Sequence, residues 1–294
     1  MPTEPQSPSA YGIQLAKLWT LAGKTLPINV KEFALEFSSS KPDPITKVKG
    51  HSVSGIDGML IQRSEKQCWY ILYQENIESP GRINFTLAHE FGHYLLHRKR
   101  QEEFRCDQRK FLTYGDVSTL KMEAEANKFA SYLLMPIDDF RNQVGPEIIS
   151  LDLLSHCADR YQVSFTAVAL KWLEFTGEAA MVVIARDGFV CWSYTSQSAR
   201  KLKVYLSPGS TLPETRGGRS LLFSDTQNKG HEVSSGVWHP KLNAVESVIL
   251  SDRFDLSIFL VQFPDANLIT HEESEENDSF DFLSARAEGL LWRK

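Results

Sequence analysis

The sequence contains the stretch Thr86-Leu87-Ala88-His89-Glu90-Phe91-Gly92-His93-Tyr94-Leu95-Leu96-His97, which decides how the N-terminal half is interpreted. His89 and His93 are four residues apart, so on a helix their imidazoles lie on one face and can bind one ion. Glu90 is turned by about 100° from His89, within reach of a water molecule beside the ion. Two neutral imidazoles, an open position for water and a carboxylate that accepts its proton are what a hydrolytic zinc site requires.

A third protein ligand is needed, because two histidines hold a zinc ion poorly. Metzincins have a glycine three residues and a histidine six residues after the second ligand, where this chain has Leu96 and Lys99. That class is therefore excluded. His97 lies about 12 Å along the helix axis from His89, too far to share the ion, and we interpret it as a rim or packing residue.

The next predicted helix offers two carboxylates, Glu123 and Glu125. On a helical wheel Glu123 shares one face with small residues such as Ala126, a face that can pack closely on the first helix. Glu125 falls on the opposite side of the wheel. We therefore predict that Glu123 is the third ligand and that Glu125 faces solvent. Asn127, one turn after Glu123, is expected to orient a ligating imidazole through its other ring nitrogen.

Two segments carry a resemblance to a known family. The first is Arg82-x-x-Phe85-Thr86-Leu87-Ala88-His89-Glu90-Phe91-Gly92-His93, and the second is Glu123-x-x-Ala126-Asn127-x-Phe129-Ala130-x-x-Leu133-Leu134-Met135-Pro136. Together they resemble the ImmA/IrrE family of zinc metallopeptidases over about residues 53–175. The resemblance implies a gluzincin-like peptidase domain with His89, His93 and Glu123 as zinc ligands and Glu90 as the base. It also implies a cytoplasmic bacterial or phage-associated protease that cleaves a helix-turn-helix repressor and so relieves repression.

Some parts of this functional interpretation stay open at the level of sequence. We expect one Zn²⁺ per chain, but histidine and carboxylate ligands also accept Mn²⁺ and other divalent metals. An additional donor to the oxyanion is expected, with Tyr94, His231 and His239 among the candidates. The alternative function is a regulatory or antitoxin-like binding protein that keeps the metal only for folding. Glu90 argues against this alternative, because a structural site needs no base.

Hydrophobic periodicity predicts an α+β fold in which a helix-rich part precedes an antiparallel sheet. Helices are expected within 11–38, in two pieces, and at about 80–100, 119–134 and 151–175. Strands are expected at 55–61, 68–73, 181–185, 189–194, 204–206, 247–250 and 256–261. We predict five successive parts: a disordered tail (1–10), a zinc peptidase domain (11–146), a helix-turn-helix-like helical segment (147–177), a β-rich domain with a candidate sensory role (178–270), and an acidic linker with a C-terminal tail (271–294).

Residues 158–170 resemble the helix-turn-helix-like segment that follows the peptidase core in this family. Residues 147–176 contain four acidic and two basic residues, the wrong balance for binding phosphates. We therefore favour structural support or substrate docking over DNA contact for this segment. A sensory role for the β-rich domain is proposed only by analogy with other members.

Composition excludes several other classes of protein. The 294 residues carry a net charge of −5, which argues against nucleic-acid binding by bulk charge. No apolar run approaches the length of about 18 residues that indicates a membrane-spanning helix, so no membrane association is expected. The N-terminus has neither a basic start nor an apolar core, so it does not resemble a secretory signal. The four cysteines lie far apart and are expected to be free thiols in a reducing cytoplasm.

Overall fold

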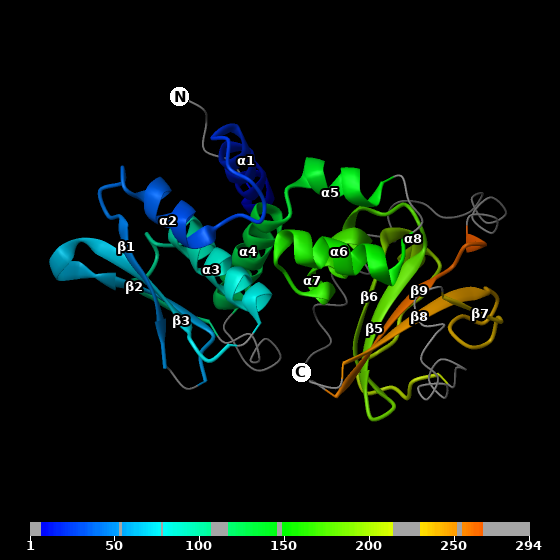
Figure 1. Ribbon diagram of the computed structural model, residues 1–294. Coiled ribbons are helices and arrows are strands. Elements are labelled where there is room, and N and C mark those ends of the chain that lie inside the picture. The colour runs from blue at the N-terminus through cyan, green and yellow to red at the C-terminus, as the bar shows by residue number, and fades with distance from the viewer. Residues whose placement is uncertain are drawn as a thin grey trace, which may run out of the picture. The chain divides into compact units, whose positions relative to one another are not determined.

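The computed structural model describes residues 7–52, 55–77, 79–106, 117–145, 149–213, 230–251 and 255–266. The chain divides into two compact units, Met1–Lys171 and Trp172–Lys294. The predicted α+β class is confirmed, with helices around a small sheet in the first unit and an antiparallel sheet in the second (Figure 1). Among the described residues, no helix is long and apolar enough to cross a membrane.

The first unit is built mainly from helices. They are α1 (Pro8–Leu21), α2 (Val30–Ser38), α3 (Pro80–Leu96), α4 (Val117–Leu134), α5 (Ile137–Val144), α6 (Leu151–Tyr161) and α7 (Phe165–Phe175), the last of which crosses the division between the units. The expected tail at 1–10 is wrong for its last residues, because α1 begins at Pro8. Ser7 accepts a hydrogen bond from the N–H of Ala10, and Pro8 occupies the first helical turn, which together start a helix.

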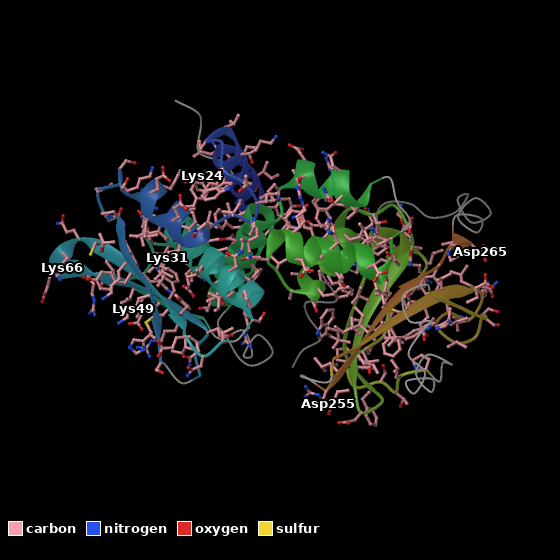
Figure 2. The ribbon with its side chains drawn as sticks, in the orientation of Figure 1. Lys24, Lys31, Lys49, Lys66, Asp255 and Asp265 are labelled. Carbon is pink, nitrogen blue, oxygen red and sulfur yellow. The ribbon has the colours of Figure 1, made fainter. Side chains whose placement is uncertain are left out.

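The sheet of the first unit has four strands in the order β1-β3-β2-β4. They are β1 (Ile45–His51), β2 (Gly58–Arg63), β3 (Cys68–Gln74) and β4 (Glu103–Cys106), with a short 3-10 turn (Ser64–Lys66) between β2 and β3. Only β1 and β3 run parallel, and the other neighbours are antiparallel. Lys66 lies at the tip of the β2–β3 hairpin (Figure 2). One face of this sheet buries Leu60, Trp69, Ile71 and Phe104, and α3 contacts β2, β3 and β4.

The second unit contains a five-stranded antiparallel sheet in the order β6-β5-β9-β8-β7. Its elements are β5 (Ala180–Arg186), β6 (Phe189–Thr195), α8 (Gln197–Lys201), β7 (His231–Val233), β8 (Ala244–Ser251) and β9 (Leu256–Gln262). Asp187 and Gly188, both with positive φ, form the turn between β5 and β6, the backbone that a tight hairpin needs. Asp255 lies at the turn between β8 and β9 (Figure 2).

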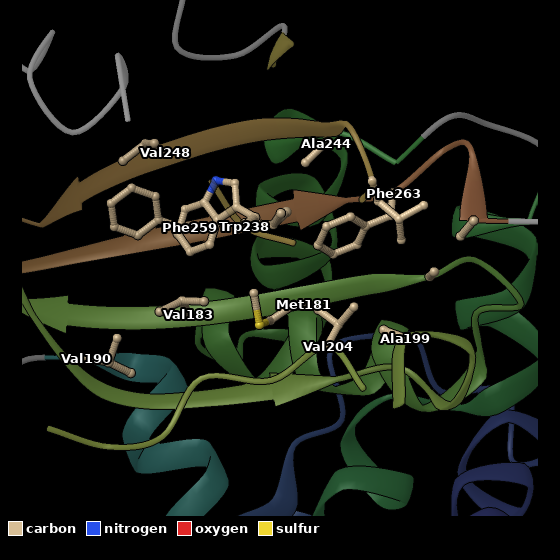
Figure 3. Close-up of a cluster of buried hydrophobic side chains, with 14 of the residues drawn as sticks. Met181, Val183, Val190, Ala199, Val204, Trp238, Ala244, Val248, Phe259 and Phe263 are labelled. Atoms are coloured by element: carbon tan, nitrogen blue, oxygen red, sulfur yellow. The ribbon is translucent and has the colours of Figure 1, made fainter. Parts of the chain in front are cut away.

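The core of the second unit lies on one face of this sheet. Alternate residues of β5, among them Met181 and Val183, point into it and meet Phe259 of β9 and the indole of Trp238 (Figure 3). The Trp238 and Phe259 rings lie 5.6 Å apart between centroids. Trp238 donates its indole N–H to Glu246 Oε2 at 2.7 Å, so this buried ring is anchored by a polar contact as well as by packing.

The predicted strand at 204–206 is wrong. Val204 is buried in the core, but Leu206 bonds with the Ser193 side chain instead of joining a strand ladder. Ser193 Oγ accepts from the Leu206 N–H at 3.2 Å and donates to the Leu206 carbonyl at 2.7 Å. The sequence interpretation also missed β1, β4 and β7, and it extended α3 beyond its observed end at Leu96. The acidic segment predicted at 271–294 lies outside the described residues.

Candidate metal centre

Helix α3 supplies the His89-Glu90-x-x-His93 motif, and α4 packs closely against it. Ser79 caps α3 by accepting from the N–H of Arg82, and Pro80 occupies its first turn. Gly92 lets the helices approach, because a Cβ at this position would lie 2.9 Å from Phe129 Cδ1 and 3.3 Å from Ala126 Cα. The small residues of both helices therefore bring Glu123 of α4 within reach of the two histidines.

The side chains of His89, His93 and Glu123 converge. Glu123 places one carboxylate oxygen 3.1 Å from His89 Nε2 and the other 3.3 Å from His93 Nε2. The two Nε2 atoms are 3.0 Å apart. Ligand atoms at zinc distances on a tetrahedron are separated by about 3.3 Å, so the separations between the two Nε2 atoms and the Glu123 carboxylate suit one zinc ion. His89 and His93 are almost fully buried and Glu123 is partly buried.

The second nitrogen of each imidazole also has a partner. His89 Nδ1 lies 2.9 Å from the side-chain oxygen of Asn127, a geometry in which the imidazole N–H donates to the amide oxygen. His93 Nδ1 lies 3.0 Å from His97 Nδ1. His97 Nε2 in turn lies 2.9 Å from Glu125 Oε2. Each of the two candidate ligands is therefore held from behind by a polar side chain.

Two sequence interpretations are tested by these contacts. Of the two alternatives for His97, the rim position is wrong and the packing role is confirmed, because His97 is fully buried and contacts His93. Glu125 is only partly exposed and contacts His97, so it does not simply face solvent on the opposite side of α4. The wheel placed Glu125 relative to Glu123 on one helix, and it contained no information about the buried histidine at the end of the neighbouring helix.

Glu90 is fully buried, and both of its carboxylate oxygens are shielded from solvent. The backbone at the start of β2 closes over it. A Cβ added at Gly58 would lie 2.5 Å from Glu90 Oε1 and 2.5 Å from Thr86 Cγ2. The preceding residue, Asp57, is held by Arg82 of α3, whose Nη2 lies 2.7 and 2.6 Å from the two carboxylate oxygens. The role of Gly58 was not recognised from the sequence, although Gly58 lies within residues 53–175, the range over which the chain resembles the family.

Burial and mutual contact shift the pKa values of the candidate ligands. Burial lowers the pKa of His93 to about 4, although the hydrogen bond with Glu123 opposes this. Burial also acts to lower the pKa of His89, but the hydrogen bond with Glu123 and the charge of Glu90 outweigh it, and the pKa is raised. Burial acts to raise the pKa of Glu123, but hydrogen bonds from both imidazoles lower it to about 2. An ionised Glu123 and a neutral His93 are the forms in which these groups bind metals.

The candidate oxyanion donors fall into two groups. Tyr94 is fully buried, and its hydroxyl donates to the carbonyl oxygen of Asp43 at 3.1 Å, so the hydroxyl hydrogen is already used in a hydrogen bond with the backbone. His231 and His239 belong to the second unit. His239 Nδ1 accepts from the N–H groups of Lys241 and Leu242 in a local turn.

Comparisons with known proteins found a similar family of domains and a similar solved structure. Residues 53–173 match the family model described as the IrrE N-terminal-like domain, Peptidase M78. Among solved structures, a Mycobacterium tuberculosis transcriptional regulator is similar, with a TM-score of 0.52 and 11% sequence identity over 86% of this chain and 76% of that chain. At this identity the likeness concerns the fold alone. A comparison with curated proteins found no significant match.

Proposed function

We propose that the protein is a zinc-dependent endopeptidase of the ImmA/IrrE type, because residues 53–173 match the family model of the IrrE N-terminal-like, metallopeptidase-type domain. The observation that carries the proposal is the convergence of His89, His93 and Glu123, together with the buried carboxylate of Glu90, which follows His89 in the chain and acts on it electrostatically. A site used only for folding usually fills all positions with protein ligands and needs no such carboxylate.

In this mechanism His89, His93 and Glu123 hold the metal. A bound zinc ion supplies Lewis-acid polarisation of the scissile carbonyl and activates the attacking water. Glu90 accepts the proton of that water and later donates it to the departing amine. Asn127 fixes the ring of His89 from behind, which keeps Nε2 directed toward Glu123. Mn²⁺ or another divalent metal remains compatible with the same ligands.

The proposed substrate is a helix-turn-helix transcriptional repressor whose cleavage relieves repression. This part of the proposal rests on the family resemblance, and the similar solved structure is itself a transcriptional regulator. The helical pair α6 and α7 is proposed to support or dock the substrate, because its segment carries more acidic than basic residues. DNA contact by this pair is disfavoured for the same reason.

The direct test is cleavage of a candidate repressor by the zinc-loaded protein. Helix-turn-helix repressors from the source genome, including products of neighbouring genes, are incubated with the full chain and analysed by gel electrophoresis and mass spectrometry. We expect one or a few defined cuts in one repressor and none with Glu90→Gln, which keeps the size of the side chain but removes the base. A zinc-loaded protein that binds a repressor without cutting it would favour the non-proteolytic regulatory alternative.

The β-rich second unit is proposed to be sensory, and the protein to act in the cytoplasm. Cys68, Cys157 and Cys191 are free thiols, which agrees with a reducing compartment. All four proposed site residues precede this unit. A chain that ends near residue 176 should therefore retain zinc and cleave with altered control. A soluble, zinc-loaded truncation without any cleavage would contradict this division of labour.

A further inference from the structure

Beyond the ligands themselves, a chain of polar contacts leads away from the proposed metal site. It runs from His93 to His97 at 3.0 Å and from His97 to Glu125 at 2.9 Å, and it joins the end of α3 to α4. We propose that His97 and Glu125 are a positioning pair that fixes the ring and the proton arrangement of His93 for metal binding. This proposal rests on the proposed function of the site and adds two residues to it.

The ring of His97 is held in place on several sides. His97 is the C-cap residue directly after α3, and its backbone N–H donates to the His93 carbonyl at 2.8 Å. Its side chain is fully buried. The ring centroid lies 5.1 Å from that of His93 and 6.2 Å from that of Phe104, which itself stacks on His93 at 4.6 Å. Packing therefore leaves His97 little freedom to turn away from His93.

The directions of the hydrogen bonds follow from the chemistry of a ligating imidazole. His93 Nε2 faces Glu123 and must be unprotonated to bind a metal, so the proton of the neutral ring resides on Nδ1. This N–H donates to His97 Nδ1, which must then be the acceptor. The proton of His97 consequently lies on Nε2, where it donates to the carboxylate of Glu125. With both rings neutral, this is the arrangement that satisfies every contact in the chain.

The role of Glu125 is to make this arrangement the preferred one. A carboxylate accepts but does not donate, so it selects the His97 form that carries its proton on Nε2. That form presents the lone pair of Nδ1 to His93. The negative charge of Glu125 strengthens the hydrogen bonds that the two imidazole N–H groups donate along this series of contacts. If position 97 only filled space, an apolar side chain would serve there. The imidazole of His97 instead buries two nitrogen atoms that are costly to leave without hydrogen-bond partners.

The test measures zinc affinity separately from folding, in the full-length protein. Zinc dissociation constants come from competition with a chromophoric chelator, and the stability of the metal-free protein from thermal unfolding in EDTA. We expect Glu125→Ala and His97→Leu to weaken zinc binding about 10- to 100-fold. His97→Gln, whose amide oxygen can still accept from His93, should recover part of the loss. Asp138→Ala removes an exposed carboxylate from α5 and serves as the matched control, with unchanged affinity.

The spectrum of the cobalt-substituted protein and a comparison of the variants distinguish the possible outcomes. The d–d spectrum of the Co²⁺-substituted protein should change in His97→Leu and Glu125→Ala, because the imidazole of His93 is no longer held in one orientation. Wild-type affinity and spectrum in Glu125→Ala would overturn the positioning role, even if the metal-free variant melts earlier. Glu125→Ala is informative where His97→Leu fails to fold, because Glu125 is partly exposed. If wild type and Glu123→Ala bind zinc equally poorly, the proposed metal site itself is wrong.

Discussion

Replacing Gly58 by alanine should disable the proposed base without removing the metal. Gly58 begins β2, and its Cα faces the buried carboxylate of Glu90. The added methyl carbon would lie 2.5 Å from Glu90 Oε1 and 2.5 Å from Thr86 Cγ2, whereas ordinary contacts begin at 3.4 Å. Each of these two contacts must therefore lengthen by about 0.9 Å, through movement of both the carboxylate and the threonine methyl or of the strand itself.

The size of the effect follows from this displacement. A misplacement of about 1 Å at a reacting group can cost roughly 100-fold in rate, and we expect a loss of that order for Gly58→Ala. Overpacking of a buried site costs about 1–3 kcal/mol of unfolding free energy, partly offset by about 0.4–1 kcal/mol from the stiffer unfolded chain. The nearest atoms to the new methyl belong to Glu90 and Thr86, so zinc occupancy should stay close to that of wild type.

The assay compares initial cleavage rates with zinc content measured by mass spectrometry on the same samples. Gly177→Ala is the matched control, because a Cβ at Gly177 would meet no atom within 4 Å. The control should cleave at the wild-type rate. A zinc-loaded Gly58→Ala protein that also cleaves at the wild-type rate would refute the argument that β2 fixes the position of Glu90.

Three further predictions follow from the described contacts. Glu90→Gln should keep zinc and thermal stability while cleavage falls by several orders of magnitude, and an unchanged rate would rule out Glu90 as the base. Glu123→Ala should lose most of the bound zinc in metal analysis, and full retention would exclude it as a ligand. Asp139 is held by Arg160 and Tyr161, and these hydrogen bonds lower its pKa despite partial burial. Asp139→Asn should therefore lower the unfolding free energy by about 1 kcal/mol at pH 7. This difference from wild type should vanish as the pH falls below about 4 and through the pKa of Asp139 in the folded protein. An equally large difference in unfolding free energy in acid would contradict this prediction.

The sequence predicted those features that depend only on the spacing of residues along one helix or between two strands adjacent in the chain. Two histidines four residues apart must share a helix face, and the observed α3 places both Nε2 atoms 3.0 Å apart. The β2–β3 hairpin was also predicted, because its strands are adjacent in the chain. The strand β1 was missed, since only Ile45 and Val48 are buried and the exposed Lys47 and Lys49 flank Val48, and its parallel partner lies more than twenty residues away.

The polar partners of the histidines were predictable only in part, for a physical reason. Asn127 was expected behind an imidazole because it follows Glu123 by one turn, and a single helix determines that relation. Glu125 contacts His97 because α3 and α4 approach each other closely at Gly92. A helical wheel describes one helix and therefore cannot give the distance between two helices. Local periodicity therefore selects candidate ligands, whereas the contacts that hold those ligands depend on helix packing. The His97–Glu125 pair is therefore a product of helix packing, and zinc affinity in Glu125→Ala tests whether this packed pair holds His93 for the metal.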